Sequence, residues 1–179
     1  MWDTRRIREL LDKLPDISPT AADLDAFAEE IGIPVPDDLR DWLKLASGPS
    51  VPSRLFGIRM RMDIESILEI HPLWKQNKWI PVADDGCGNY YVVATQQEFG
   101  KGFPILFIDT MESSEQPQYL VASDIGHFIL FFVEHEINPR FDSEGWPFGE
   151  KYVLQTDPDI LNFKKELLPW VVNEKSRGM

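Results

Sequence analysis

The sequence predicts an α+β fold: N-terminal helices, a central antiparallel meander sheet, a covering C-terminal helix, and an extension beyond that helix. Before residue 49, apolar residues recur at the spacing of amphipathic helices. Between residues 79 and 122 the pattern changes to short runs rich in β-branched and aromatic residues, bounded by Gly, Pro, Asn and Asp, which is typical of strands. Helices and strands segregated in this order favour an α+β fold over an alternating α/β fold.

Three helices are predicted at the N-terminus. The first carries the apolar residues of 2–14. The second is expected over 20–31, because Gly32 stands just past its last apolar position, where a helix end favours glycine. The third begins at Pro36, which suits a first helical turn, and ends before Gly48.

Residues 56–62 predict a strand, because apolar and basic side chains alternate there with the period of two of a half-buried strand. Asp63 is expected to cap a short helix that ends near Ile70. The remaining elements are a hairpin, two further strands and a helix, over residues 80–83, 90–94, 103–109, 118–122 and 125–137.

The link between the hairpin strands, residues 84–89, has two interpretations. Asp84, Asp85 and Asn89 bring oxygen ligands together beside glycines, as calcium loops do. An EF-hand loop places its ligands at alternate positions, however, and Gly86 stands where the second ligand would be. We therefore favour a structural turn, since tight turns also select Asp, Asn and Gly.

The length of 179 residues suits one domain with a terminal extension. We expect a single domain over 1–137 and a C-terminal extension over 138–179, packed on or near the domain. Its clear helical piece opens at Asp157 and Pro158 and ends before Pro169.

Charge is distributed unevenly along the chain, which has 18 basic and 30 acidic residues and a net charge of −12. Between residues 84 and 136, Lys101 is the one base against nine acids: Asp84, Asp85, Glu98, Asp109, Glu112, Glu115, Asp124, Glu134 and Glu136. This bias disfavours nucleic acid as a partner, because binding phosphates needs a basic face. It suits a basic protein, whose encounter an acidic face accelerates, although acids that serve solubility alone would give the same bias.

We expect a cytoplasmic protein that is a monomer or a weak homodimer. No apolar run approaches the roughly 20 residues of a bilayer-spanning helix, and residues 1–10 lack the apolar segment of a signal peptide. No membrane association is therefore expected. The one cysteine, Cys87, excludes an intrachain disulfide and has no base near it in sequence that would activate a nucleophile.

The sequence favours a protein that is not an enzyme. His127 and His135 lie eight residues apart on the predicted helix, which is not the spacing of a zinc protease helix, and no third ligand is indicated. We expect the histidines at solvated helix positions. No phosphate-binding loop or nucleophile elbow appears, so no catalytic residue, metal or cofactor is expected. Six tryptophans leave a small-ligand sensor as an alternative.

Three segments, taken in order, resemble one family. They read IPVPDDLRDWLKLASG at 33–48, WIPVADDGCGNYYVVA at 79–94 and PILFIDTMESSEQPQYLVASDIGHFILFFVE at 104–134. Together they resemble the Smi1/Knr4 family, also called the SUKH superfamily, over roughly residues 16–137. The turn SGPSVP at 47–52 and the tail beyond residue 137 depart from the family pattern.

The resemblance implies a SUKH-like fold and a protein-binding function. Bacterial members are mostly immunity proteins that neutralise polymorphic toxins, often nucleases, whereas fungal members are regulatory scaffolds. An acidic single-domain chain fits the first role, with a cognate basic toxin as partner. A regulatory scaffold or a small-ligand sensor of the same fold is the alternative. Tyr90 and Tyr91 alternate, so one of them should point inward. The residues expected at the contact are Asp84, Asp85, Tyr90, Asp109, Glu112 and Glu115.

Overall fold

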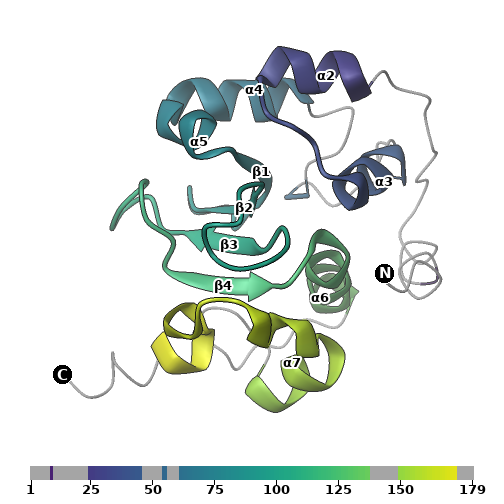
Figure 1. Cartoon of the computed structure of the whole chain (residues 1–179), viewed down its shortest axis with the longest axis vertical. Helices are drawn as coiled ribbons and strands as arrows, with labels where there is room; N and C mark the ends of the chain where they lie inside the picture. The colour runs from purple at the N-terminus through teal and green to yellow at the C-terminus, as the bar shows by residue number, and fades with distance from the viewer. Residues whose placement is uncertain (1–8, 10–23, 46–53, 56–60, 138–148, 173–179) are drawn as a thin grey trace.

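A four-stranded antiparallel sheet lies at the centre of the structure, with its strands ordered as they occur in the chain (Figure 1). The computed structural model describes residues 9, 24–45, 54–55, 61–137 and 149–172. Its strands are β1 (Trp79–Asp84), β2 (Tyr90–Ala94), β3 (Ile105–Ile108) and β4 (Tyr119–Ala122). The predicted α+β fold with a meander sheet is confirmed, although β3 and β4 are shorter than the apolar runs that predicted them.

β1 is an edge strand, which explains how it accommodates a proline. Pro81 has no N–H to donate to a neighbouring strand, and the register shifts between Pro81 and Ala83 as at a β-bulge. Leu55 forms an isolated antiparallel bridge with Ala83, and the Asp84 N–H donates to the Arg54 carbonyl (2.9 Å). These contacts cover part of an edge that would otherwise be open to pairing.

Helices cover the sheet. α4 (Arg61–Ile70) and α5 (Pro72–Asn77) contact β1, whereas α6 (Ile125–Ile137) contacts β4 and also α3 (Asp37–Leu45). α2 (Leu24–Ile31) packs on α4. Because nearly every strand position is buried, both faces of the sheet are covered. Within the described ranges, no helix combines the length and the apolar character that crossing a bilayer requires.

Several helix ends after residue 23 lie where the sequence predicts them. α2 ends before Gly32, whose φ of 68° is left-handed and whose N–H donates to the Ala28 carbonyl (3.0 Å). α3 begins directly after Pro36, and α6 has the predicted bounds. The predicted first helix over 2–14, apart from the helical Glu9, lies outside the described residues, as does Gly48.

The predicted strand over 56–62 is wrong where the structure describes it. Arg61 and Met62 open α4, so Asp63 lies inside that helix and does not cap it. Residues 56–60 lie outside the described residues. Alternation over so short a window does not distinguish a half-buried strand from the first turn of an amphipathic helix.

The sequence did not predict α5. This helix has six residues and one fully buried side chain, Trp74, so no helical period is visible in the sequence. The features typical of a helix lie at the ends of α5: Pro72 stands in the first turn, and Lys78 takes a left-handed φ of 58° at the C-cap.

The C-terminal segment, residues 149–172, packs into the same core as the sheet. It contains α7 (Glu150–Thr156) and two 3-10 helices, η2 (Pro158–Asn162) and η3 (Lys165–Leu167). The single helical piece predicted between Asp157 and Pro169 is therefore wrong in form, and α7 was missed. A domain of 1–137 with an extension of 138–179 stays a prediction. The buried side chains of the segment are Val153, Ile160, Phe163 and Leu168.

Two glycines allow this segment to lie close to the β2–β3 connection. Phe163 forms a bridge with Gly100, and a Cβ added at Gly100 would lie 2.7 Å from Phe163 Cδ1. Gly102 has a φ of 134° and faces the same ring. The close approach of the two backbones thus depends on residues without a side chain.

Candidate functional site

All six residues expected at the contact lie at one end of the sheet, in its connections or at the adjoining strand ends. In an antiparallel meander, the β1–β2 and β3–β4 connections lie at the same end. Thr110 joins them, because its N–H donates to Asn89 Oδ1 (3.1 Å) and its hydroxyl donates to the Gly88 carbonyl (2.8 Å). Residues 84–90 and 109–115 are together termed the acidic loop pair. The predicted members that it contains are Asp84, Asp85, Tyr90, Asp109, Glu112 and Glu115.

The carboxylates of the hairpin loop close the loop. Asp84 Oδ1 accepts a hydrogen bond from the Gly86 N–H (2.7 Å). Asp85 Oδ1 accepts from the N–H groups of Cys87 (2.7 Å) and Asn89 (3.1 Å), and Asp85 Oδ2 accepts from Asn89 Nδ2 (2.8 Å). In the part of the chain that the structure describes, no group of three or more His, Cys, Asp or Glu residues has a metal-binding arrangement. These oxygens satisfy turn amides, as in Asx turns.

Replacing Asp85 with Ala is expected to destabilise the protein by about 1–2 kcal/mol, because it removes the acceptor of three hydrogen bonds in a turn. Urea unfolding measures this change. Glu112→Ala replaces an exposed acid of the same loop pair and should lower the free energy of unfolding by less than about 0.5 kcal/mol. Equal stabilities of the two variants would contradict a structural role for Asp85.

The β3–β4 loop is also held by its own hydrogen bonds. Asp109 Oδ1 accepts from the N–H groups of Met111 (2.9 Å) and Glu112 (3.3 Å). Trp74 Nε1, on α5, donates to the Ser114 carbonyl (2.6 Å). Asp109 is therefore a cap within the loop, whereas Glu112 and Glu115 are exposed to solvent.

Met111 is a residue at this end that the sequence analysis missed. It is 88% exposed, although it stands between the half-buried Thr110 and the acid Glu112 in an ordered loop. The available signal was an apolar side chain in the otherwise polar connection between two predicted strands. Such an exposed side chain beside several acids offers an apolar contact within a charged surface.

The two tyrosines of β2 point in different directions, as their alternation predicts. Tyr91 is buried, and its ring packs against Phe107 and Phe128. Tyr90 is half-buried, with its ring edge-on to Trp74 at 5.4 Å. Burial raises the pKa of Tyr90, and the charges of Asp84 and Asp85 raise it further, so its hydroxyl is neutral near pH 7.

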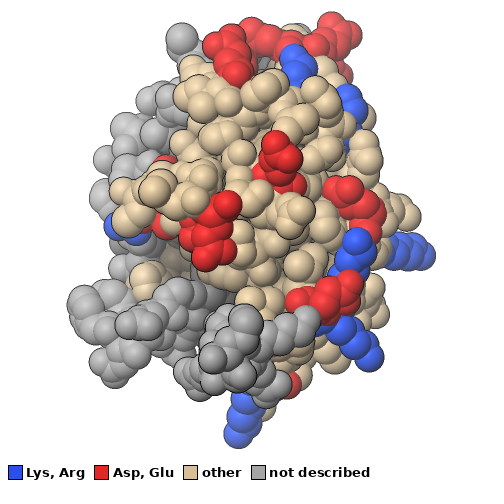
Figure 2. All heavy atoms as spheres, turned by 90° about the vertical axis from the view of Figure 1, so that its left-hand side faces the viewer, with Lys and Arg blue, Asp and Glu red and all other residues tan. Residues whose placement is uncertain are grey.

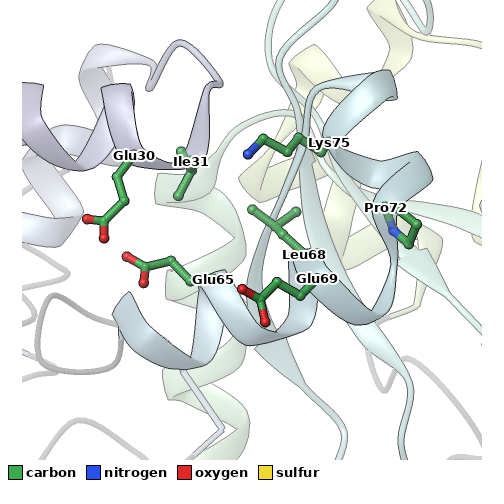
Figure 3. A pocket seen from close by; sticks show the side chains of 7 residues that line it. All are labelled: Glu30, Ile31, Glu65, Leu68, Glu69, Pro72 and Lys75. Atoms are coloured by element: carbon green, nitrogen blue, oxygen red, sulfur yellow. The ribbon is translucent and has the colours of Figure 1, made fainter.

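A separate pocket of about 390 Å³ lies between α2, α4 and α5 (Figure 3). Carboxylates from two helices approach it, Glu30 on α2 and Glu65 and Glu69 on α4, while Lys75 extends toward it from α5. Its apolar wall is formed by Ile31, Leu68 and Pro72. This pocket is not visible in the sequence, because its lining residues come together only when the three helices pack.

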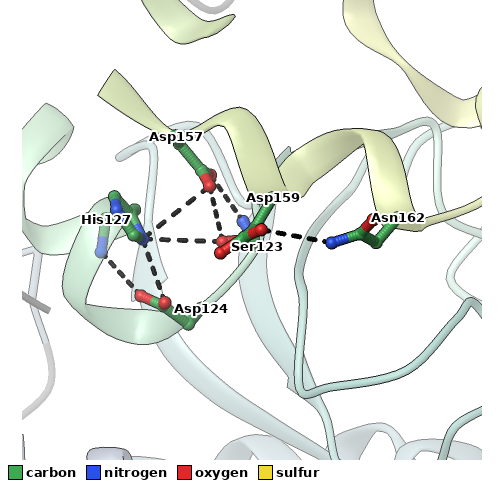
Figure 4. A network of polar contacts seen from close by, with 6 residues as sticks. All are labelled: Ser123, Asp124, His127, Asp157, Asp159 and Asn162. Atoms are coloured by element: carbon green, nitrogen blue, oxygen red, sulfur yellow. Dashed lines mark hydrogen bonds and ion pairs between the residues drawn. The ribbon is translucent and has the colours of Figure 1, made fainter. Parts of the chain in front are cut away.

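A polar cluster at the start of α6 contains a Ser, a His and two Asp residues (Figure 4). The Asp124 carboxylate caps α6 by accepting a hydrogen bond from the His127 N–H (2.8 Å). Asp124 Oδ2 and Ser123 Oγ both approach the same ring nitrogen, His127 Nδ1, at 2.9 and 3.5 Å. A catalytic relay needs nucleophile and orienting acid on opposite ring nitrogens, so this geometry is structural.

The expectation of solvated histidines is wrong for this position. The His127 side chain is 21% exposed and lies in the polar cluster, and His71 and His135 are also half-buried. His71 stacks on Trp74 with ring centroids 4.3 Å apart, and burial lowers the pKa of His71. Helical spacing alone did not reveal the approach of His127 to Asp157, because Asp157 lies in the C-terminal segment.

Comparison with known families identifies the type of domain. The model of the SMI1 / KNR4 family (SUKH-1) matches residues 18–130, which include the helices α2 to α5, the whole sheet and the acidic loop pair. The chain belongs to the SMI1/KNR4 family. This confirms the resemblance of the three sequence segments. No curated protein and no solved structure matches the chain.

The SUKH family is known for immunity proteins, and its domain is generally not an enzyme. A protein partner is therefore the general expectation for a member of the SMI1/KNR4 family. The match ends within α6, so the segment 149–172 lies beyond the part of the chain that carries the family pattern.

Proposed function

We propose that this protein is an immunity protein that acts in the cytoplasm and neutralises a cognate basic toxin through the acidic loop pair. The observation that carries the proposal is the gathering of acids from two loops at one end of a SUKH domain. A nuclease toxin has a cationic substrate cleft, to which such acids are complementary. Neutralisation would then require this protein to cover the cleft, and it would not require catalysis by this protein.

The surface at this end is suited to such a partner. The β3–β4 connection extends to the left of the sheet in Figure 1, and Figure 2 faces that side. Asp and Glu side chains are spread over the middle and top of this face, whereas most Lys and Arg side chains lie toward its margins. A carboxylate surface of this kind accelerates the encounter with a basic protein and disfavours acidic ones.

Met111 would supply an apolar anchor among these acids. The backbone on either side of its loop is held by Asp109 and by the bond from Trp74 to Ser114. Contact would therefore order little additional chain, which lowers the entropic cost of binding. Binding energy in interfaces concentrates on a few such side chains, while surrounding charges exclude wrong partners.

Co-expression tests the proposal. Cells that express the product of the reading frame adjacent to this chain's gene are expected to die, and to survive when this protein is co-expressed. With the purified pair, the dissociation constant should rise at least about tenfold between 50 mM and 500 mM salt, because screening weakens charge pairing.

Each outcome has a distinct meaning. An affinity that salt leaves unchanged would remove the electrostatic part of the proposal. An adjacent product without toxicity, together with no rescue, would overturn the immunity function and favour a regulatory scaffold.

A small-ligand sensor is the second candidate, and the pocket between α2, α4 and α5 favours it. The pocket is flanked by Pro72 and Lys75, on either side of Trp74 in α5. A metabolite that enters it should therefore alter tryptophan fluorescence. A metabolite panel without any fluorescence change would exclude this candidate for the metabolites tested.

A further inference from the structure

One buried carboxylate anchors the segment 149–172 to the family domain. Asp157, between α7 and η2, is fully buried. Its carboxylate accepts hydrogen bonds from the Ser123 N–H (2.7 Å) and the Ser123 hydroxyl (2.6 Å), 34 residues earlier in the chain (Figure 4). Because Ser123 stands between β4 and α6, this contact joins the segment to the sheet and to its covering helix.

His127 places a titratable ring beside this anchor. Its Nδ1 lies 2.9 Å from Asp124 Oδ2 and 3.8 Å from Asp157 Oδ1. Asp159 on η2 acts on the same ring, and Asp38 on α3 is close enough to Asp124 for the two charges to interact. A protonated ring would thus face Asp124, Asp157 and Asp159. A neutral ring would leave Asp157 buried beside other acids without its countercharge.

We propose that protonation of His127 controls how firmly the segment 149–172 is held on the domain: the imidazolium fastens the segment, and deprotonation loosens it. This inference is independent of the proposed function, because the anchor lies away from the acidic loop pair and the segment lies beyond the family match.

The directions of the pKa shifts agree with this linkage. Burial lowers the pKa of His127, but the hydrogen bond and charge of Asp124, with the charges of Asp157 and Asp159, outweigh burial and raise this pKa. Burial raises the pKa of Asp157, against the lowering effects of Ser123 and His127. The charges of Asp157 and Asp159 act on His127 only while the segment is docked, whereas that of Asp124 stays on the domain. This part of the raised pKa links proton binding at His127 to docking of the segment.

The sign of the pH dependence follows. A raised folded-state pKa of His127 gives stabilisation that is complete below its ordinary pKa of 6.5 and is lost as the pH rises through the raised value. Burial raises the pKa of Asp124, but its hydrogen bond with His127 and the charge of His127 lower this pKa by more. The net shift of the Asp124 pKa is therefore downward. The Asp124 contribution is therefore lost only in acid, below the ordinary carboxyl range.

Loosening the segment would uncover apolar surface on the domain. The ring of Tyr152 packs against Phe131 of α6 with centroids 6.0 Å apart, and the Tyr152 hydroxyl donates to Glu134. Phe163 lies over Gly100 and Gly102. A rise in pH would therefore expose more of α6 and of the β2–β3 connection.

Hydrogen exchange on the full chain at pH 6 and pH 8, corrected for intrinsic exchange rates, tests the proposal. Protection of the amides of 150–172 should fall by about threefold to tenfold at the higher pH, while the amides of β2 and β3 serve as the internal reference. In His127→Gln, which carries no titrating ring, this fall should disappear.

Equal protection of the segment at both pH values in the wild type would overturn the proposal, as would an undiminished fall in His127→Gln. If that variant does not fold, NMR titration of His127 in the wild type and in Asp157→Asn decides. A pKa above 6.5 that falls in Asp157→Asn supports the proposal; a pKa at or below 6.5, or one that Asp157→Asn leaves unchanged, overturns it.

Discussion

Replacing Asp157 with Ala is expected to lower the free energy of unfolding by about 3 kcal/mol. The carboxylate is fully buried and accepts the N–H and the hydroxyl of Ser123, so its removal leaves two buried donors without an acceptor. It also removes one of the acids that face His127. Urea unfolding followed by far-UV circular dichroism measures the change.

Asp159→Ala is the matched control, two residues further along the chain. Asp159 is exposed and accepts a hydrogen bond from Asn162 Nδ2 at 3.2 Å. Its replacement should change stability by less than about 0.5 kcal/mol. An Asp157→Ala variant as stable as Asp159→Ala would show that the buried carboxylate does not anchor the segment.

Reversing two charges in the acidic loop pair, with Glu112→Lys and Glu115→Lys, is expected to weaken toxin binding by about 100-fold at low salt. Both side chains are exposed, so the double variant should fold as the wild type does. Lysines at these positions would face a basic partner, and like charges brought together in an interface cost several kcal/mol. Titration calorimetry with the purified toxin, and rescue by co-expression, measure the effect.

Glu150→Lys with Glu166→Lys gives the same change of net charge away from the loops. Both residues are exposed and lie on α7 and η3. This control should keep most of the wild-type affinity, because distant exposed charges are screened. Equal losses in the two double variants would show that overall charge matters and that the acidic loop pair is not the contact.

The sheet and α6 were predictable from sequence because their signals are local. β-branched and aromatic runs end at glycines that take left-handed φ, such as Gly86 at 78° and Gly88 at 95°. α6 combines a capping Asp124 with a long apolar segment. In contrast, α5 and η2 are too short to show a period, and the start of α4 was mistaken for a strand because two residues fit either pattern.

The candidate site was predictable in composition but not in the role of each residue. The meander topology brings the predicted acids together, as alternate connections of antiparallel strands must do. Their roles differ because the backbone amides around them differ: Asp85 and Asp109 accept bonds from their own loops, while Glu112 and Glu115 are exposed. Met111 was overlooked because exposure is not a property of a residue type.

The sequence by itself determined the fold class, the family and the acidic character of one half of the chain, since periodicity, turn residues and charge are properties of short windows. Only the tertiary structure decided which carboxylates close turns, which acids remain exposed, and that Asp157 meets Ser123 and His127. The contact of Asp157 with Ser123 and His127 joins residues far apart in the chain. Packing of the whole core selects such partners, and a short window of sequence does not contain that information.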